Sequence, residues 1–191
     1  MKLIDPKIKY KIDSKRLFIR PIIIEDINDA YIGWLNDQET NKYLVTRQAN
    51  RESIIEYINN LRKLNLDLFA VFDKKRNLHI GNISITSLEE NTGCYGLMIG
   101  DKSSRLVGLG GEASLCVIKF LFDSLGIERL EVGANKQNSD ACRNLLDLGF
   151  LEFSVNSTSR IFELSNVQWN INRRTNSRLY KNIKIEFLKF N

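Results

Sequence analysis

Three glycines stand within four positions, Gly108, Gly110 and Gly111, just before an apolar run that ends near Phe122. Glycine adopts backbone conformations closed to other residues and lets a ligand approach the main chain without meeting a Cβ. The alternating residues 95–99 upstream indicate a strand, and the apolar run downstream indicates a helix. A helix beginning here would offer free N–H groups and the positive end of its dipole to an anion. The glycines therefore predict either a tightly packed loop or a phosphate-binding turn.

Two common phosphate-binding patterns do not fit this stretch. The dinucleotide fingerprint GxGxxG requires a glycine where the chain has Ala113, and no acidic residue closes a βαβ unit behind it. A P-loop requires Lys followed by Ser or Thr at its end, where Glu112 and Ala113 stand. What remains is a strand, a short loop and a helix N-terminus with unpaired amides.

The rest of the chain predicts a mixed α/β fold in one domain, since 191 residues with 43% apolar and 27% charged side chains can bury a substantial core. Strands are expected over residues 16–22, 66–73, 79–86, 93–100, 129–135 and 150–155, with residues 74–77 as a hairpin turn. Helices are expected over residues 25–37, 51–63, about 111–125 and 139–148. A tail strand within residues 180–190 would leave an edge for a homodimer.

Composition narrows the compartment and excludes several kinds of site. The chain has no apolar run of membrane-spanning length, and its first residues are too charged for a signal peptide, so we expect a cytoplasmic protein with no membrane contact. Its cysteines, Cys94, Cys116 and Cys142, are far apart and accompanied by a single histidine, His79. Neither a disulfide framework nor a zinc site is indicated.

The positive charge is concentrated at the C-terminal end. Residues 155–191 hold seven Lys or Arg against two Glu, which equals the net charge of +5, so residues 1–154 are neutral. Such a segment would suit RNA, an acidic protein or a phosphorylated ligand. A solvated polar edge is the favoured alternative, because no arginine-rich run with interleaved aromatic residues appears.

Arg105, Gly108 and Gly110 form the pattern RxxGxG between a strand and a helix, which resembles the coenzyme A signature of the GNAT superfamily of N-acetyltransferases. The later stretch ANKQNSDACRNLLDLGF, residues 134–150, is similar to the family's second half. The resemblance covers about residues 16–155. It implies a GNAT acyl-CoA N-acyltransferase fold, in which a mostly antiparallel sheet has splayed fourth and fifth strands. One domain would span residues 1–191, with residues 156–191 as a basic extension.

The resemblance implies acetyl-CoA as acetyl donor, with no metal, and a set of binding positions. The pantetheine arm would bond the strand edge like an added strand, and the diphosphate would sit on backbone amides. Further side chains would reach the pantetheine, the phosphates and the nucleotide, although helix capping or a solvated surface would explain them equally well. The edge residues are Leu97, Met98 and Ile99, the amides are those of Val107, Gly108, Leu109, Gly110 and Gly111, and the side chains are Asn135, Asn138, Arg105 and Arg143.

The implied chemistry is direct attack of an amine on the thioester, with a backbone N–H at Met98, or at Ile99, stabilising the oxyanion. A base must first take a proton from the ammonium group. Strand alternation places Glu131 beside the cleft, where burial would raise its pKa and suit it to this role. An ion pair with Arg129 is the alternative. His79 is a weaker candidate, expected to be exposed at a hairpin strand.

The chain departs from many family members in one respect, because Leu145 stands where they carry a tyrosine that protonates the departing thiolate. A thiol with a pKa of about 8.5 leaves with modest help. Cys142 is interpreted as an apolar filler, since direct transfer needs no acyl-enzyme.

Residues 31–44 resemble the first-helix segment of GNAT members that acetylate nucleotide-linked amino sugars, and also that of Rim-type ribosomal-protein N-terminal acetyltransferases. Trp34 and Tyr43 would stack on the acceptor, and Asn36 and Asp37 would bind its polar groups; core packing and turn capping are the alternatives. The favoured function is N-acetylation of an amino sugar. The alternatives are a protein N-terminal acetyltransferase and a non-catalytic acyl-CoA-binding or RNA-binding module.

Overall fold

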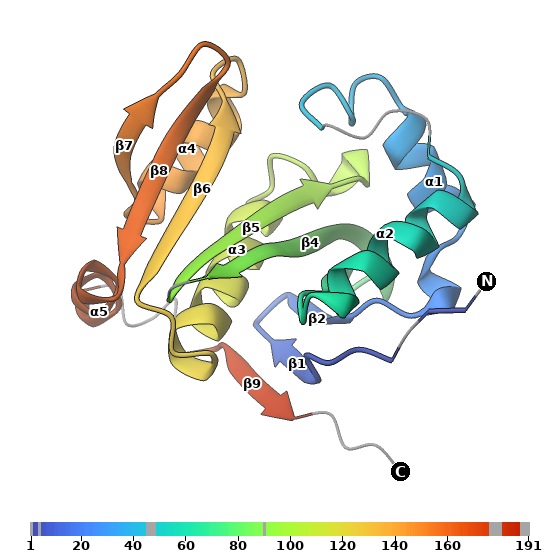
Figure 1. Ribbon diagram of the computed structural model, residues 1–191, viewed down its shortest axis with the longest axis horizontal. Helices are drawn as coiled ribbons and strands as arrows, with labels where there is room; N and C mark the ends of the chain where they lie inside the picture. Colours follow the sequence, from blue (N-terminus) through green and yellow to red (C-terminus); the bar gives the residue numbers. More distant parts are fainter. Residues whose placement is uncertain (1, 4, 45–48, 90, 176–180, 188–191) are drawn as a thin grey trace.

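The computed structural model describes residues 2–3, 5–44, 49–89, 91–175 and 181–187. The strands form one sheet in the order β7-β8-β6-β5-β4-β3-β2-β1-β9, flanked by helices (Figure 1). The strands are β1 (Tyr10–Asp13), β2 (Leu17–Pro21), β3 (Leu68–Asp73), β4 (Leu78–Glu89), β5 (Thr92–Ile99), β6 (Arg129–Asn135), β7 (Leu151–Val155), β8 (Ser159–Ser165) and β9 (Lys184–Phe187). The helices are α1 (Asp29–Asn36), α2 (Arg51–Lys63), α3 (Leu109–Lys119), α4 (Ser139–Asp147) and α5 (Asn166–Thr175), with short turns η1 (Ile24–Asp26), η2 (Lys102–Ser104) and η3 (Phe120–Ser124).

One pairing in this sheet differs from all the others that the structure describes. β5 and β6 are parallel and pair at two positions only, Thr92 with Arg129 and Gly93 with Leu130. Beyond these pairs the two strands diverge toward their C-terminal ends (Figure 1). By contrast, β6 pairs with β8 at seven positions. β5 and β6 are the fourth and fifth of the strands expected from the sequence, so their predicted splay is confirmed. We call the space between β5 and β6 the split.

The helices bury faces that their sequences anticipate. In α2, Ile54, Ile58 and Leu61 recur at helical spacing and are buried, and Asn50 caps the first turn by accepting a backbone hydrogen bond. Figure 1 shows α2 in front of the sheet and α3 behind it. Because α3 crosses behind the middle of the sheet, residues 113–118 are all buried.

The predicted elements are present within a few residues, and three others had been missed. The helix predicted from Gly111 begins at Leu109, so that Gly110 and Gly111 form its first turn. The missed elements are β1, β8 and α5, all outside or at the ends of the segment on which the resemblance rests.

The C-terminal segment is built into the sheet at two places. β8 lies between β6 and β7, and β9 pairs antiparallel with β1 at the far edge. Of the predicted tail strand, residues 184–187 form β9 and residues 181 and 182 form a turn before it; residues 180 and 188–190 lie outside the described residues. The homodimer stays a prediction. Among the helices that the structure describes, none is long and apolar enough to cross a membrane.

Candidate active site

The edge of β5 that faces the split carries backbone groups of alternate residues. The Gly100 N–H donates to the Ile80 carbonyl on β4 at 2.9 Å, and Met98 is paired with Asn82 two positions along the ladder. Because backbone groups alternate along a strand, the Met98 N–H also points toward β4. The split is faced instead by Leu97 and Ile99. The structure therefore disfavours Met98 as the oxyanion donor and is compatible with the alternative, Ile99, or with Leu97.

The N-terminus of α3 lies beside this edge and presents unpaired amides. Gly108 is the N-cap residue and has a φ of +78°, a left-handed conformation that explains why glycine is needed there. The first helical hydrogen bond runs from the Glu112 N–H to the Gly108 carbonyl. The amides of Leu109, Gly110 and Gly111 precede it, so they have no acceptor within the helix and suit an anion.

Gly110 helps to decide whether the glycines form a tightly packed loop or a phosphate-binding turn. A Cβ built on it would meet only the Ile99 and Leu97 side chains, at 3.7 and 3.8 Å, which is ordinary van der Waals contact. Tight packing therefore does not require glycine at this position. Glycine at this position leaves the main chain of the first α3 turn open to a ligand beside β5.

A charged clamp that sequence reasoning missed holds this loop in place. The Arg16 guanidinium donates to the carbonyls of Val107 at 2.9 Å and Gly108 at 3.0 Å, and pairs with the Glu112 carboxylate at 2.6 Å. The same carboxylate accepts bonds from the Ser14 hydroxyl at 2.7 Å and the Arg16 N–H at 2.8 Å. The turn between β1 and β2 thus fixes the first turn of α3. Only the RLFIRPI strand pattern marked Arg16 in the sequence, and nothing linked it to Glu112.

Arg105 is directed away from the role expected of it. Its guanidinium donates to the carbonyl of Ile99 at 3.0 Å and to the Thr40 hydroxyl at 2.7 Å, and it pairs with Glu39 at 3.2 Å. These partners connect the RxxGxG loop to the segment after α1. Arg105 would have to leave them to bind a phosphate, whereas Arg16 already lies at the loop.

The other residues expected to bind acetyl-CoA lie on the β6 side of the split. Asn138 caps α4 by accepting a bond from the Ala141 N–H at 3.2 Å, and Asn135 closes a turn by accepting one from the Gln137 N–H at 2.9 Å. Arg143 is exposed on α4. The side-chain oxygens of both asparagines are therefore used in capping, as the alternative expected. Contact of these residues with a pantetheine arm stays a prediction.

Glu131 has the predicted orientation and also the predicted alternative partner. Leu130 and Val132 are buried on the opposite face of β6. The Glu131 carboxylate lies 3.3 Å from the Arg129 guanidinium, and its side chain is 37% exposed, so the expected burial is absent. Glu163 of β8 is directly opposite it and lies 3.7 Å from Arg129. Two carboxylates therefore share one guanidinium beside the split.

The expectation that His79 is exposed is wrong. It is 9% exposed and packs with the rings of Tyr31, Trp34 and Phe72 at centroid distances of 5.9, 5.1 and 5.2 Å. Burial lowers its pKa. The hairpin position suggested a solvated ring, but α1 covers this end of β4, which disfavours His79 as the base.

The four predicted acceptor residues have mostly structural contacts. Trp34 covers Gly100, where a Cβ would lie 2.0 Å from its ring. Asn36 bonds the Ala49 carbonyl and N–H at 2.8 and 2.9 Å. Asp37 accepts bonds from Thr40 and Lys102. The Thr40 bonds, with help from Lys102, lower the pKa of Asp37.

Tyr43 differs from these three, because its hydroxyl donates to the Gln137 carbonyl at 2.9 Å. Tyr43 follows α1, whereas Gln137 follows β6. This hydrogen bond therefore links the two sides of the molecule that flank the open end of the split.

Apart from Arg160, which is opposite Ala134 of β6 and pairs with Glu152, the described part of the basic segment lies away from the open end of the split. α5 and β9 are near the closed end of the split and the far edge of the sheet (Figure 1). Arg173 pairs with Asp123 at 3.2 Å, and Lys184 is in register with Asp13 of β1. Arg178 and Lys189 fall outside the described residues. A role for these charges at the acceptor site therefore finds no support. Within the described residues no group of three or more His, Cys, Asp or Glu could hold a metal.

The clamp predicts a pH dependence of stability. Burial would raise the pKa of Glu112, but the Arg16 N–H, the Ser14 hydroxyl and the Arg16 guanidinium together lower it. A carboxyl whose folded pKa is below its unfolded value stabilises fully above the unfolded value, about 4.3, and loses this as pH falls through the folded one. We expect Glu112→Gln to cost about 1 to 3 kcal/mol at pH 7 and much less at pH 3. Urea unfolding measures this.

The matched control is Glu56→Gln, which removes an exposed carboxylate on α2. Its effect should be small at both pH values. A loss in Glu112→Gln that is equal at pH 7 and pH 3 would contradict the clamp's charge-dependent role.

Comparison with known proteins identifies this architecture. The family model described as an acetyltransferase (GNAT) domain matches residues 16–151. A search of curated proteins found no match. The solved structure of apo FdhC, a nucleotide-linked sugar GNAT, superposes with a TM-score of 0.75 at 19% identity, covering 90% of this chain and 99% of that one.

Two further solved structures share the fold. The ribosomal-protein-S5-alanine acetyltransferase from Vibrio fischeri has a TM-score of 0.67 at 19% identity, covering 83% of this chain and 98% of its own. The aminoglycoside acetyltransferase AAC(6')-Ib, in complex with coenzyme A, has a TM-score of 0.72 at 14% identity, covering 82% and 99%. With the sheet, the split and the matched residues in agreement, the chain belongs to the GNAT family of acetyl-CoA-dependent N-acetyltransferases.

Proposed function

We propose that this N-acetyltransferase acts on the amine of an amino sugar carried on a nucleotide. The main support for acetyl-CoA binding is a row of unpaired amides beside the edge of β5 that faces the split. These amides belong to Leu109, Gly110 and Gly111. In the proposal these amides hold the diphosphate of acetyl-CoA. The Leu97 backbone groups and the Ile99 N–H pair with its pantetheine arm as an added strand would, since the Ile99 carbonyl already accepts a bond from Arg105. Asn135, Asn138 and Arg143 line the other side, as the resemblance implies.

The reaction needs a base and an oxyanion donor from the chain. Glu131, directly or through a water, takes a proton from the ammonium group of the acceptor. The freed amine attacks the thioester carbonyl, and the Leu97 N–H stabilises the resulting oxyanion. The new C–N bond forms as the C–S bond breaks, and coenzyme A leaves as a thiolate. Because Leu145 is buried where other members carry a tyrosine, the thiolate leaves without that acid.

Two observations support a compact acceptor over a protein N-terminus. The Tyr43 to Gln137 hydrogen bond spans the open end of the split, which leaves less room for an extended peptide there. In addition, the superposition with the nucleotide-linked sugar enzyme takes in 90% of this chain, against 83% for the ribosomal-protein enzyme. N-terminal acetylation of a protein is the second candidate, and binding without turnover is the third.

The acceptor is identified by the release of free coenzyme A, measured with a thiol reagent. The protein is incubated with acetyl-CoA and either nucleoside-diphosphate amino sugars or N-terminal peptides. We expect thiol release with the sugar nucleotides. Release with peptides alone would overturn the proposal in favour of the protein acceptor, and silence with both would favour a binding module.

The donor site is tested by Gly110→Gln. The longer side chain would run from α3 over Leu97 and Ile99 into the place assigned to acetyl-CoA. We expect acetyl-CoA affinity, measured by calorimetry, to fall at least about tenfold, equivalent to about 1.4 kcal/mol. Thermal stability should not fall, because glutamine favours a helix more than glycine does.

A matched control for this variant is Gly33→Gln on α1, where an added Cβ meets nothing within 4 Å. It should bind acetyl-CoA as the wild type does. Wild-type affinity in Gly110→Gln would remove the assignment of this turn to the donor.

The base is tested by Glu131→Gln. We expect kcat at pH 7 to fall by about 100-fold or more, with acetyl-CoA affinity unchanged. The loss should shrink at high pH, where the acceptor amine deprotonates without help. Glu163→Gln removes the carboxylate directly opposite and serves as the control, with little expected change. Full activity of Glu131→Gln at pH 7 would exclude it as the base.

A further inference from the structure

We propose that Tyr57, Ser84 and the bare backbone of Gly96 form the surface on which the acceptor is positioned, and that the two hydroxyls bind a hydroxyl of its sugar. We call these three residues the acceptor wall. The inference rests on the proposed function, because it assigns residues to the acceptor half of that reaction. None of the three was singled out by the sequence.

Tyr57 is placed by α2. It follows Ile54 by three residues and precedes Leu61 by four, so it lies at the border of the buried stripe. The side chain is 43% exposed. Partial burial raises the pKa of its hydroxyl, and the nearby Ser84 hydroxyl opposes that rise. The phenol therefore reaches from α2 to the face of β4 and stays neutral at physiological pH.

Ser84 connects this tyrosine to the strand that borders the split. It is directly opposite Gly96 in the ladder between β4 and β5. Its Oγ lies 3.0 Å from the point where a Cβ of Gly96 would be. Gly96 is exposed although its neighbour Tyr95 is buried. An exposed glycine inside a sheet marks a site where a ligand or another backbone can approach closely.

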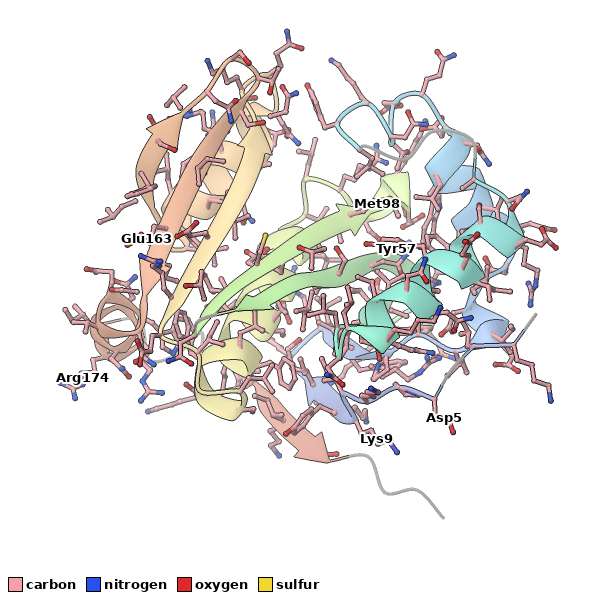
Figure 2. The ribbon with its side chains drawn as sticks, in the orientation of Figure 1. Asp5, Lys9, Tyr57, Met98, Glu163 and Arg174 are labelled. Carbon is pink, nitrogen blue, oxygen red and sulfur yellow. The ribbon has the colours of Figure 1, made fainter. Side chains whose placement is uncertain are left out.

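The acceptor wall lies next to the groups that the reaction uses. Gly96 adjoins Leu97, whose N–H faces the split. Figure 2 shows Tyr57 and Met98 on the β5 side of the split and Glu163 on the β6 side. Glu163 is directly opposite Glu131, so the proposed base is also on that far side. An acceptor placed over Gly96 would have hydroxyl partners on one side and the Glu131 carboxylate on the other.

This arrangement separates two recognition tasks. The Glu131 carboxylate suits the ammonium group of the acceptor. The Tyr57 and Ser84 hydroxyls can each donate one hydrogen bond and accept others, which matches a sugar hydroxyl. The open backbone at Gly96 accommodates the flat face of a ring without a side chain in the way. An amino sugar offers both an ammonium group and neighbouring hydroxyls.

The test compares Tyr57→Phe, Ser84→Ala and the double variant with the wild type. Each single variant keeps the packing and removes a hydroxyl. We expect the KM for the amino sugar nucleotide to rise about 3- to 10-fold in each, as the loss of one hydrogen bond implies. The KM for acetyl-CoA should stay unchanged. Because the hydroxyls interact with each other, the double variant should show less than the product of the two effects.

Tyr10→Phe is the matched control, because it removes a phenol hydroxyl from β1 at the other edge of the sheet. Ser84→Thr keeps a hydroxyl and should retain more acceptor affinity than Ser84→Ala. An unchanged acceptor KM in Tyr57→Phe and Ser84→Ala, with the wild type active on the sugar nucleotide, would overturn the acceptor wall and leave the proposed function intact.

Gly96→Ala gives a second, independent measurement. Its methyl group would crowd Ser84 and cover the bare backbone, so acceptor turnover should fall while calorimetry shows normal acetyl-CoA binding. In the double variant Gly96→Ala with Ser84→Ala, the methyl group no longer meets the Ser84 hydroxyl but still covers the backbone at position 96. Turnover restored to the level of Ser84→Ala would overturn the role of Gly96.

Failure of the proposed function would give results that differ from failure of the acceptor wall alone. If the wild type neither acetylates the sugar nucleotide nor binds it in calorimetry with coenzyme A present, the proposed function fails, and the assignment of the two hydroxyls to a sugar fails with it. If the wild type instead acetylates peptides and Tyr57→Phe leaves the peptide KM unchanged, the acceptor wall is overturned for that acceptor as well.

Discussion

The two-position pairing of β5 with β6 is the constraint on which the candidate site depends. A longer parallel ladder would use the backbone groups of Leu97 and Ile99 and leave no edge for an added strand. It would also close the space next to the first turn of α3. Since α3 is the crossover between these two strands, the same departure that frees the edge brings the unpaired amides of Gly110 and its neighbours beside it. The proposed donor site therefore depends directly on the divergence of β5 and β6.

β6 stays in the sheet beyond its short pairing with β5 because β8 pairs with its other edge. β8 pairs with β6 at seven positions, from Arg129 with Ser165 to Asn135 with Ser159. An unpaired backbone group buried away from water costs free energy comparable to a lost hydrogen bond. The long antiparallel ladder satisfies the backbone groups on one edge of β6, and the groups that face the split stay open to water or a ligand. This strand lies beyond residue 151, where the family match ends.

The sequence alone was informative where a residue's role is local. The glycines, the strand before them and the helix after them predicted the unpaired amides, and the RxxGxG resemblance predicted the splay. It was uninformative where the role depends on residues far apart in the chain. The Arg16 to Glu112 contact joins positions 96 residues apart, and His79 is covered by α1 only once the hairpin is folded. Tyr57 could not be found because its partner Ser84 lies on a different element.

The clamp between the β1–β2 turn and α3 has a consequence for the edge of the sheet. Arg16 and Ser14 hold the loop carbonyls and the first helical turn, and β1, directly before them, holds β9. A ligand that binds the folded α3 turn shifts the equilibrium away from any state in which this turn has come apart. Occupancy of the proposed donor site would therefore disfavour the fraying of β1, and with it the release of β9, although neither strand would touch the ligand. The C-terminal strand is coupled thermodynamically to a site on the opposite side of α3.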